Sequence, residues 1–248
     1  MSLERLVSIM RRLRDPTTGC EWDRQQSFAT IAPYTIEEAY EVADAIARDD
    51  VPALADELGD LALQVVFHSQ MAEETGHFTL DQVLEGICDK LERRHPHIFG
   101  NASASPGWEA IKAAERQKKP DSSALAGIAM ALPALDRAQK LQRRAAGAGF
   151  DWPDARGPRA KIDEELAELD AESDYALREE ELGDLLFAVV NLARHLNIDA
   201  EEALRKGNRK FEARFRKIEG APGFSAMSLD EMVALWVRAK ADQAVSKA

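Results

Sequence analysis

Ten acidic residues form two sets that share the same order and nearly the same spacing. They are Glu37, Glu38, Glu41, Glu57 and Asp60 in the first set, and Glu164, Glu165, Glu168, Glu181 and Asp184 in the second. Each set reads Glu-Glu-x-x-Glu, then a spacer, then Glu-x-x-Asp. Residues three and four apart share one face of a helix, so each set predicts two helices that each present a cluster of carboxylates.

Such clusters indicate a metal site. Like charges at helical spacing destabilise a helix by roughly 0.2–0.5 kcal/mol per pair, and more as the local dielectric constant falls. The alternative is that the acidic faces point separately into water. Against it, Glu57 and Asp60 lie inside the apolar stretch 54–66, where Leu58 and Leu61 must face a core, and the arrangement occurs twice. Carboxylate ligands without cysteine or paired histidine select a hard cation, so we expect Mg²⁺, with Mn²⁺ as the alternative.

Basic side chains follow each acidic set. Mg²⁺ is seldom held by protein ligands alone and normally binds together with substrate phosphates. Lys90 and Arg94 in the first half, and Lys210 and Arg214 in the second, stand four residues apart on the next predicted helix, where they could contact those phosphates. Ordinary surface pairing with neighbouring glutamates is the alternative. Lys161 is a further candidate for substrate binding.

The elements that position these side chains are expected to be helices. Of the 248 residues, 45% are apolar, 31% are charged and only 6% are aromatic, which favours amphipathic helices over strands. Apolar residues recur at helical spacing across 54–65 and 182–196, and the alternation typical of strands is nowhere sustained. The sequence therefore predicts an all-α fold.

The two acidic sets belong to an internal repeat. Glu-Leu-Gly-Asp-Leu occurs at 57–61 and again at 181–185, and both copies run on into a Val-Val pair. Two copies of one helical unit are the economical interpretation. We therefore predict two domains, 1–120 and 121–248, with the boundary after the Lys-Lys-Pro break that ends at Pro120.

Charge and hydropathy exclude several classes of protein. The net charge of −12 argues against a nucleic-acid partner, because binding to a phosphate backbone depends on Lys and Arg. No stretch approaches 18 consecutive apolar residues, and Met-Ser-Leu-Glu-Arg at the start lacks a signal-peptide core. We therefore expect no membrane partner and a cytoplasmic location. Cys20 and Cys88 are far apart and are interpreted as incidental thiols.

These blocks closely resemble the MazG family of nucleoside triphosphate pyrophosphohydrolases, in the all-α NTP pyrophosphatase superfamily. Other stretches that resemble its two-domain bacterial members are 10–16, 19–23, 31–34, 90–97, 132–135, 149–152 and 191–195. The resemblance implies a tandem of four-helix-bundle-like domains assembled as a homodimer. It also implies Mg²⁺-dependent hydrolysis of an NTP or dNTP substrate to the monophosphate and pyrophosphate, in a housecleaning role for the nucleotide pool.

The resemblance further implies roles for particular residues. All ten carboxylates are expected to bind the metal, and the family pattern favours the second half, with Lys210 and Arg214 on the phosphates. The first half keeps its full acid set, so its residues give no chemical reason to consider it inactive. Arg178 stands near where a lysine is expected ahead of Glu-x-x-Asp, which leaves its phosphate role open. By position, the candidate general bases are Glu37, Glu38, Glu164 and Glu165.

Two other functions remain open from the sequence. One is a dimeric helical adaptor with a vestigial metal site, in which an amphipathic segment such as 229–237 docks a partner. The other is a di-metal phosphohydrolase that acts on a different phosphorylated substrate. Trp22 and Trp152 either stack on a base or, as we favour, anchor their loops onto the bundles.

Overall fold

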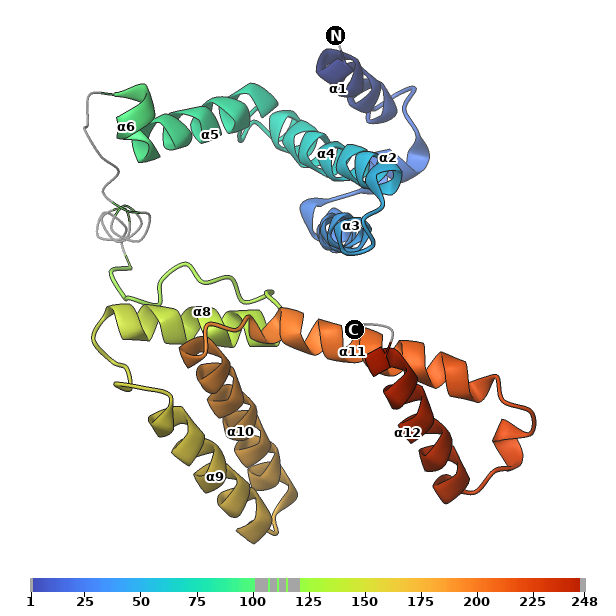
Figure 1. The fold of residues 1–248 in the computed structure, drawn as a ribbon. Helices are drawn as coiled ribbons and strands as arrows, with labels where there is room; N and C mark the ends of the chain where they lie inside the picture. The colour runs from blue at the N-terminus through green and yellow to red at the C-terminus, as the bar shows by residue number, and fades with distance from the viewer. Residues whose placement is uncertain (1, 101–106, 108–110, 112–114, 116–120, 246–248) are drawn as a thin grey trace. The chain divides into compact units, whose positions relative to one another are not determined.

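The structure is a computed structural model that describes residues 2–100, 107, 111, 115 and 121–245, without the side chains of 243–245. The chain forms two compact units, residues 1–112 and 113–248. All regular elements within the described ranges are helices, which confirms the predicted all-α fold (Figure 1). Pro120, where the predicted domain boundary falls, lies outside the described residues.

The first unit is built around a helical hairpin. Its helices are α1 (Ser2–Leu13), α2 (Glu21–Gln25), α3 (Phe28–Ala47), α4 (Val51–Glu74), α5 (Leu80–Arg94) and α6 (Pro96–Phe99). Helix α3 begins at a capping box, in which the Ser27 hydroxyl accepts the Thr30 N–H and the Thr30 hydroxyl accepts the Ser27 N–H. Helix α4 begins at Asp50, whose carboxylate accepts the Ala53 N–H at 3.1 Å. These caps leave a short turn at 48–50, so α3 and α4 pack against each other along their length.

The core of the first unit lies on one side of this hairpin. Met10 of α1, Ile31 of α3 and three residues of α4, Val66, Phe67 and Met71, are buried together. Three helices thus meet over a small apolar cluster. This cluster fixes α3 and α4 relative to each other and therefore fixes the acidic residues that they carry.

The second unit repeats the hairpin. Its helices are α8 (Ala134–Gly147), α9 (Arg156–Ala171), α10 (Tyr175–His195), α11 (Ala200–Glu219) and α12 (Leu229–Val245), with a short 3₁₀ helix η1 (Phe224–Ala226). Helix α10 begins at Asp174, whose carboxylate accepts two backbone N–H groups, and α9 and α10 pack together as α3 and α4 do. Helix α8 packs on α10, where the Gln142 side-chain amide donates to the Phe187 carbonyl at 2.8 Å.

Apolar side chains of both hairpins remain exposed in the chain. Leu58 has 49% of its surface exposed, and Leu182, at the matching position of α10, has 47%. The prediction that Leu58 faces a core is therefore wrong for the single chain. The physical reason is that α1 and α3 cover other sides of α4, and α8 and α9 cover other sides of α10. The hairpins thus carry apolar surface beside their acidic residues.

No helix among the described residues combines the length and the apolar character that crossing a bilayer requires. Both cysteines, Cys20 and Cys88, carry free thiols and are exposed.

Candidate metal and active site

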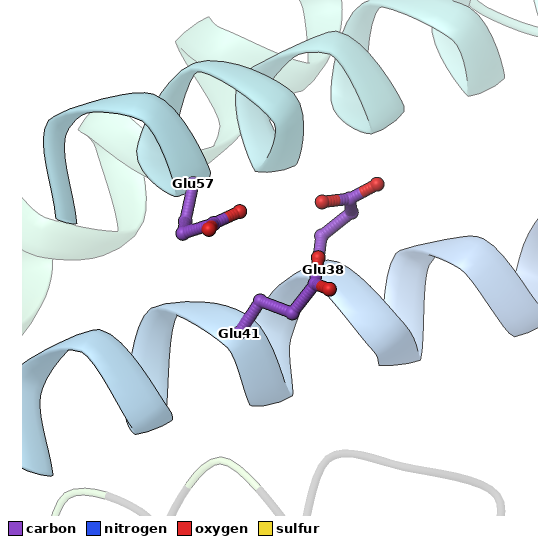
Figure 2. A group of neighbouring side chains, drawn as sticks. All are labelled: Glu38, Glu41 and Glu57. Carbon is purple, nitrogen blue, oxygen red and sulfur yellow. The ribbon is translucent and has the colours of Figure 1, made fainter. Parts of the chain in front are cut away.

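The α3–α4 hairpin brings together three carboxylates of the first acidic set. Glu38 and Glu41 of α3 and Glu57 of α4 each offer one oxygen, and these oxygens lie within 4.8 Å of one another. Figure 2 shows the side chains reaching into the space between the two helices. Three oxygens this close together suit a single hard cation, which Mg²⁺ coordination places about 2.1 Å from each ligand.

Burial and mutual repulsion raise the pKa values of two carboxyl groups in this cluster. Burial, followed by the nearby Asp60 and Glu41 carboxylates, raises the pKa of Glu38 above its ordinary value. Burial and then the Glu41 carboxylate likewise raise the pKa of Glu57. The Gln64 amide donates a long hydrogen bond of 3.5 Å to Glu38. The group therefore concentrates negative charge that an added cation would stabilise.

The α9–α10 hairpin forms a second group of the same composition. Glu165 and Glu168 of α9 and Glu181 of α10 offer oxygens within 4.8 Å of one another. Glu165 is only 3% exposed, and the Lys161 ammonium lies 2.6 Å from its carboxylate and 2.8 Å from that of Glu164. These two hydrogen bonds raise the pKa of Lys161, and burial followed by Glu168 and Glu165 raises the pKa of Glu181. A tethered cation therefore already partners this group.

The remaining acidic candidates lie around these two groups. Asp60 is close enough to raise the pKa of Glu38, and Asp184 is close enough to raise the pKa of Glu181. Glu37 and Glu164 are exposed and stay outside the three-carboxylate groups of the described chain. The structure thus brings together the second and third glutamates of each Glu-Glu-x-x-Glu motif. The first glutamate is not a member of the group, although Glu164 is linked to Glu165 through the Lys161 ammonium.

The basic candidates lie on neighbouring helices. Lys90 and Arg94 belong to α5, which packs against α4 and α6. Lys210 and Arg214 belong to α11, which packs against α8 and α12. The Arg214 guanidinium lies over the ring of Trp236, with 5.7 Å from its central carbon to the ring centre. A role on substrate phosphates stays a prediction for all four residues.

Two glutamines were not predicted from the sequence. Gln64 is buried and donates to Glu38. It stands four residues after Asp60, so helical spacing could have placed it beside the carboxylates. Gln142 is buried where α8 meets α10. Its hydrogen-bond partner is a backbone carbonyl 45 positions away, so no local sequence pattern predicts this contact.

Trp22 and Trp152 both contact neighbouring elements. Trp22 belongs to the short helix α2, so the prediction of a loop at this position is wrong, whereas Trp152 lies in the loop between α8 and α9. The Trp22 ring meets Phe67 edge-on, with 6.5 Å between ring centres. The Trp152 ring lies so close to Gly157 that a Cβ at that position would be 2.4 Å from it. These contacts agree with the anchoring interpretation. Trp152 also remains 49% exposed, and its exposed side lines a cavity.

Each of the two helical hairpins brings three carboxylates together. The chain is thus an all-α protein with two candidate cation sites. Residues 26–99 and 160–218 match the family model of the MazG nucleotide pyrophosphohydrolase domain. The chain belongs to this family. The first matched segment contains the α3–α4 hairpin, and the second contains the α9–α10 hairpin from residue 160 onward. The resemblance seen in the sequence is therefore confirmed.

Relatives that align over nearly the whole of this chain agree with this assignment. The chain is 51% identical over 254 residues to a nucleoside triphosphate pyrophosphohydrolase of Escherichia coli, covering 96% of this chain and 97% of that protein. It is 49% identical over 234 residues to the nucleoside triphosphate pyrophosphohydrolase/pyrophosphatase MazG of Thermotoga maritima, covering 92% and 90%. It is also 42% identical to an uncharacterized protein of Bacillus subtilis, and this alignment covers 94% of this chain and 50% of that protein.

Proposed function

We propose that the chain is a nucleoside triphosphate pyrophosphohydrolase, which hydrolyses NTPs or dNTPs to the monophosphate and pyrophosphate. The observation that carries the proposal is the three-carboxylate group held between two helices, in a chain of the MazG family. Relatives that carry this activity in their names align over nearly the whole chain at about half identity. A role in clearing unwanted nucleotides from the cellular pool is consistent with this chemistry.

The cofactor we propose is Mg²⁺, with Mn²⁺ as the alternative. The donor set fits a hard divalent cation, because it consists of carboxylate oxygens only. Its ligands would be Glu38, Glu41, Glu57, with Asp60 beside them, in the first unit, and Glu165, Glu168, Glu181, with Asp184 beside them, in the second. When bound, Mg²⁺ neutralises phosphate charge and makes water more acidic.

The protein's own residues supply the remaining chemistry. A carboxylate of the leading pair, Glu164 or Glu165 in the second unit, takes the proton of the water that attacks the α-phosphorus. Glu37 or Glu38 has the same role as general base in the first unit. Lys161 sits beside this pair, and we assign its ammonium to the substrate phosphates once these displace it from the carboxylates. Lys210 and Arg214, with Lys90 and Arg94 as counterparts, steady the departing pyrophosphate.

The partner we propose is a second copy of the chain. Leu229, Val233 and Val237 stand four residues apart along α12 and are 74%, 49% and 58% exposed. Such a stripe on an amphipathic helix is typical of a surface that another chain covers. No nucleic-acid partner is proposed, since the net charge is −12, and the cytoplasm is the proposed location.

Product analysis tests the proposed function. Purified protein is incubated with each NTP and dNTP and Mg²⁺, and the products are separated by ion-exchange chromatography. We expect monophosphate and pyrophosphate, with no turnover when EDTA removes the metal. Diphosphate and phosphate would contradict hydrolysis at the α-phosphorus. The absence of any turnover would favour the helical adaptor with a vestigial metal site.

A further inference from the structure

A buried amide lies against the carboxylate group of the first unit. Gln64 of α4 is 7% exposed, and its Nε2 donates to the Glu38 carboxylate of α3 at 3.5 Å. Gln64 stands one turn after Asp60, so the two side chains share one face of α4. Figure 2 shows Glu38 reaching from α3 into the space between the two helices. The amide therefore belongs to the surroundings of the group that Glu38 forms with Glu41 and Glu57.

One atom of this amide lacks a partner. Gln64 Oε1 is buried without a hydrogen-bond partner among the described residues. An amide turned the other way would set Oε1 against the Glu38 carboxylate, so Nε2 faces Glu38. The neighbouring side chains of the group are carboxylates, which only accept hydrogen bonds when they are ionised. A buried acceptor without a donor is unfavourable, so the donor that Oε1 requires comes from a bound molecule.

The hydration shell of a divalent cation supplies such a donor. Mg²⁺ takes six oxygen ligands and usually keeps several waters, whereas the hairpin offers one oxygen from each of three glutamates. A water that coordinates a cation through its oxygen turns its hydrogens outward and needs acceptors around it. Outer partners of this kind orient the ligands of a metal and tune its affinity. Gln64 Oε1 is an acceptor beside one of the proposed ligands.

The packing of α3 on α4 supports the amide. One turn further along both helices, the Thr35 hydroxyl and His68 Nε2 are 3.0 Å apart. Thr35 precedes Glu38 by three residues and His68 follows Gln64 by four. The two contacts therefore cross the hairpin one after the other on the same faces of the helices. A residue that holds a ligand shell must itself be fixed by its neighbours, and this second contact provides that support.

The second unit has no counterpart of these polar side chains. The repeat aligns Glu57 with Glu181 and Glu38 with Glu165. Apolar residues then stand at the three matching positions, namely Ala188 for Gln64, Leu192 for His68 and Ile162 for Thr35. The buried carboxylate of the second unit has the Lys161 ammonium beside it instead. The amide is thus a feature of the first unit alone.

We propose that Gln64 is an outer ligand of the cation in the first unit, that is, a residue that bonds the hydration shell and not the cation itself. Its Oε1 accepts a hydrogen bond from a water of that shell, and its Nε2 orients the Glu38 carboxylate. The proposal rests on the proposed function for the cation and adds a positioning residue to it. Because the partners of the amide are Glu38 and water, this role requires no nucleotide.

Variants of the full chain test the proposal in a background without the second carboxylate group. Glu168→Gln together with Glu181→Gln removes two of its proposed ligands. Gln64→Met then removes the amide at similar length, and Gln64→Glu keeps an acceptor but loses the donor. Gln142→Met is the matched control, because Gln142 is also a buried glutamine, 6% exposed, whose Oε1 has no partner among the described residues, but it lies in the other unit.

Mn²⁺ without nucleotide is the probe, and the electron paramagnetic resonance signal of free Mn²⁺ measures its affinity. We expect Gln64→Met to bind Mn²⁺ about 10–100-fold more weakly than the background does. Gln64→Glu should bind it at least as tightly as the background, because it retains an acceptor and adds negative charge. Gln142→Met should bind it as the background does. Circular dichroism verifies that each variant keeps its helices.

Unchanged affinity in Gln64→Met, or a background that binds no Mn²⁺, would overturn the proposal. Equal losses in Gln64→Met and Gln64→Glu would overturn the role of Oε1, since only the donor Nε2 would then matter. A loss in Gln142→Met would show that the effect is not specific to the first group. Turnover of the wild type is measured separately. Its absence would overturn the proposed function, whereas normal turnover with unchanged Mn²⁺ affinity in Gln64→Met would overturn this inference alone.

Discussion

Glu38 and Glu165 occupy matching positions in the two units but have different neighbours. The Glu165 carboxylate lies 2.6 Å from the Lys161 ammonium, whereas Glu38 accepts a long hydrogen bond from the neutral Gln64 amide. A charged donor compensates a carboxylate more strongly than a neutral amide does. The second unit is therefore better prepared to hold a dense negative cluster, and we expect it to carry most of the activity.

Glutamine substitutions compare the two units directly. We expect Glu165→Gln to lower kcat by about 100-fold or more, because a neutral amide replaces a proposed metal ligand. Glu38→Gln should have a much smaller effect. Pyrophosphate release at saturating Mg²⁺ and nucleotide measures both, with the exposed Asp163→Asn on the same helix as control. The opposite order of effects would place catalysis in the first unit.

The ion pair between Arg194 of α10 and Asp151 of the loop after α8 predicts an acid-dependent loss of stability. The hydrogen bond from Arg194 is the main cause that lowers the pKa of Asp151 from 3.8 to about 2. A folded-state pKa below the unfolded value stabilises the fold above about pH 4, and this contribution is lost as the pH falls toward 2. We expect Asp151→Asn to have a lower Tm than the wild type at pH 7 and the same Tm near pH 2.

Thermal unfolding at intervals between pH 7 and pH 2 checks this expectation. The exposed Asp170→Asn serves as the control for loss of one negative charge. A difference in Tm between wild type and Asp151→Asn that stays constant across this range would show that ionisation of Asp151 does not stabilise the fold.

At this scale, spacing predicted part of the site. Glu38 and Glu41 lie three apart on one helix face, and Glu57 joins them because the Asp50 cap starts α4 directly after a short turn. Glu37 is rotated by about 100° from Glu38, which takes it away from the group. Gln142 could not be predicted, because its environment exists only after α8 packs on α10.

The contact between the loop after α8 and the start of α9 depends on a glycine. Gly157 lies under the Trp152 ring, and a Cβ there would approach the ring to 2.4 Å. We expect Gly157→Ala to lower the free energy of unfolding by about 1–3 kcal/mol, because ring or helix must shift. Urea unfolding followed by tryptophan fluorescence measures it.

Gly183→Ala is the matched control for this substitution. It also adds one methyl group to a helix of the second unit, but its Cβ would meet nothing within 4 Å. It should therefore stabilise the chain by up to about 1 kcal/mol through helix propensity. A Gly157→Ala protein as stable as Gly183→Ala would show that Trp152 is not held against α9.

The helices themselves were predictable, because local signals specify them. Asp50 and Asp174 cap the second helix of each hairpin, and the apolar spacing of 54–65 and 182–196 is helical throughout. Which neighbouring elements bury the apolar side chains of each helix was not predictable. The sequence requires Leu58 to be apolar, but which surface covers Leu58 depends on tertiary or quaternary packing.

At the scale of the whole molecule, the exposed stripe on α12 predicts a homodimer. We expect Val237→Asp to shift the sedimentation coefficient toward that of a monomer, because a carboxylate would be buried without a partner in the interface. Val51→Asp, which places the same charge on an exposed position of α4, should leave the assembly unchanged. A dimer that persists in Val237→Asp would move the interface to another face.

The repeat predicted two units of one helical type. The structure has two units, and each contains a helical hairpin with a group of three glutamates. What the repeat could not show is how the units differ. The differences lie in single residues, such as Lys161 beside Glu165 in the second unit and Gln64 beside Glu38 in the first. Their effect depends on the neighbours that folding provides.

Lys161 has a consequence for how the second unit takes up metal. Its ammonium already neutralises part of the carboxylate group, so an entering cation exchanges with a tethered counter-ion and does not simply fill a vacant negative site. In the first unit Glu38 meets the neutral Gln64 amide, so a cation that enters there exchanges with no ammonium bonded to Glu38 among the described residues. The two units thus differ in what an entering cation must displace.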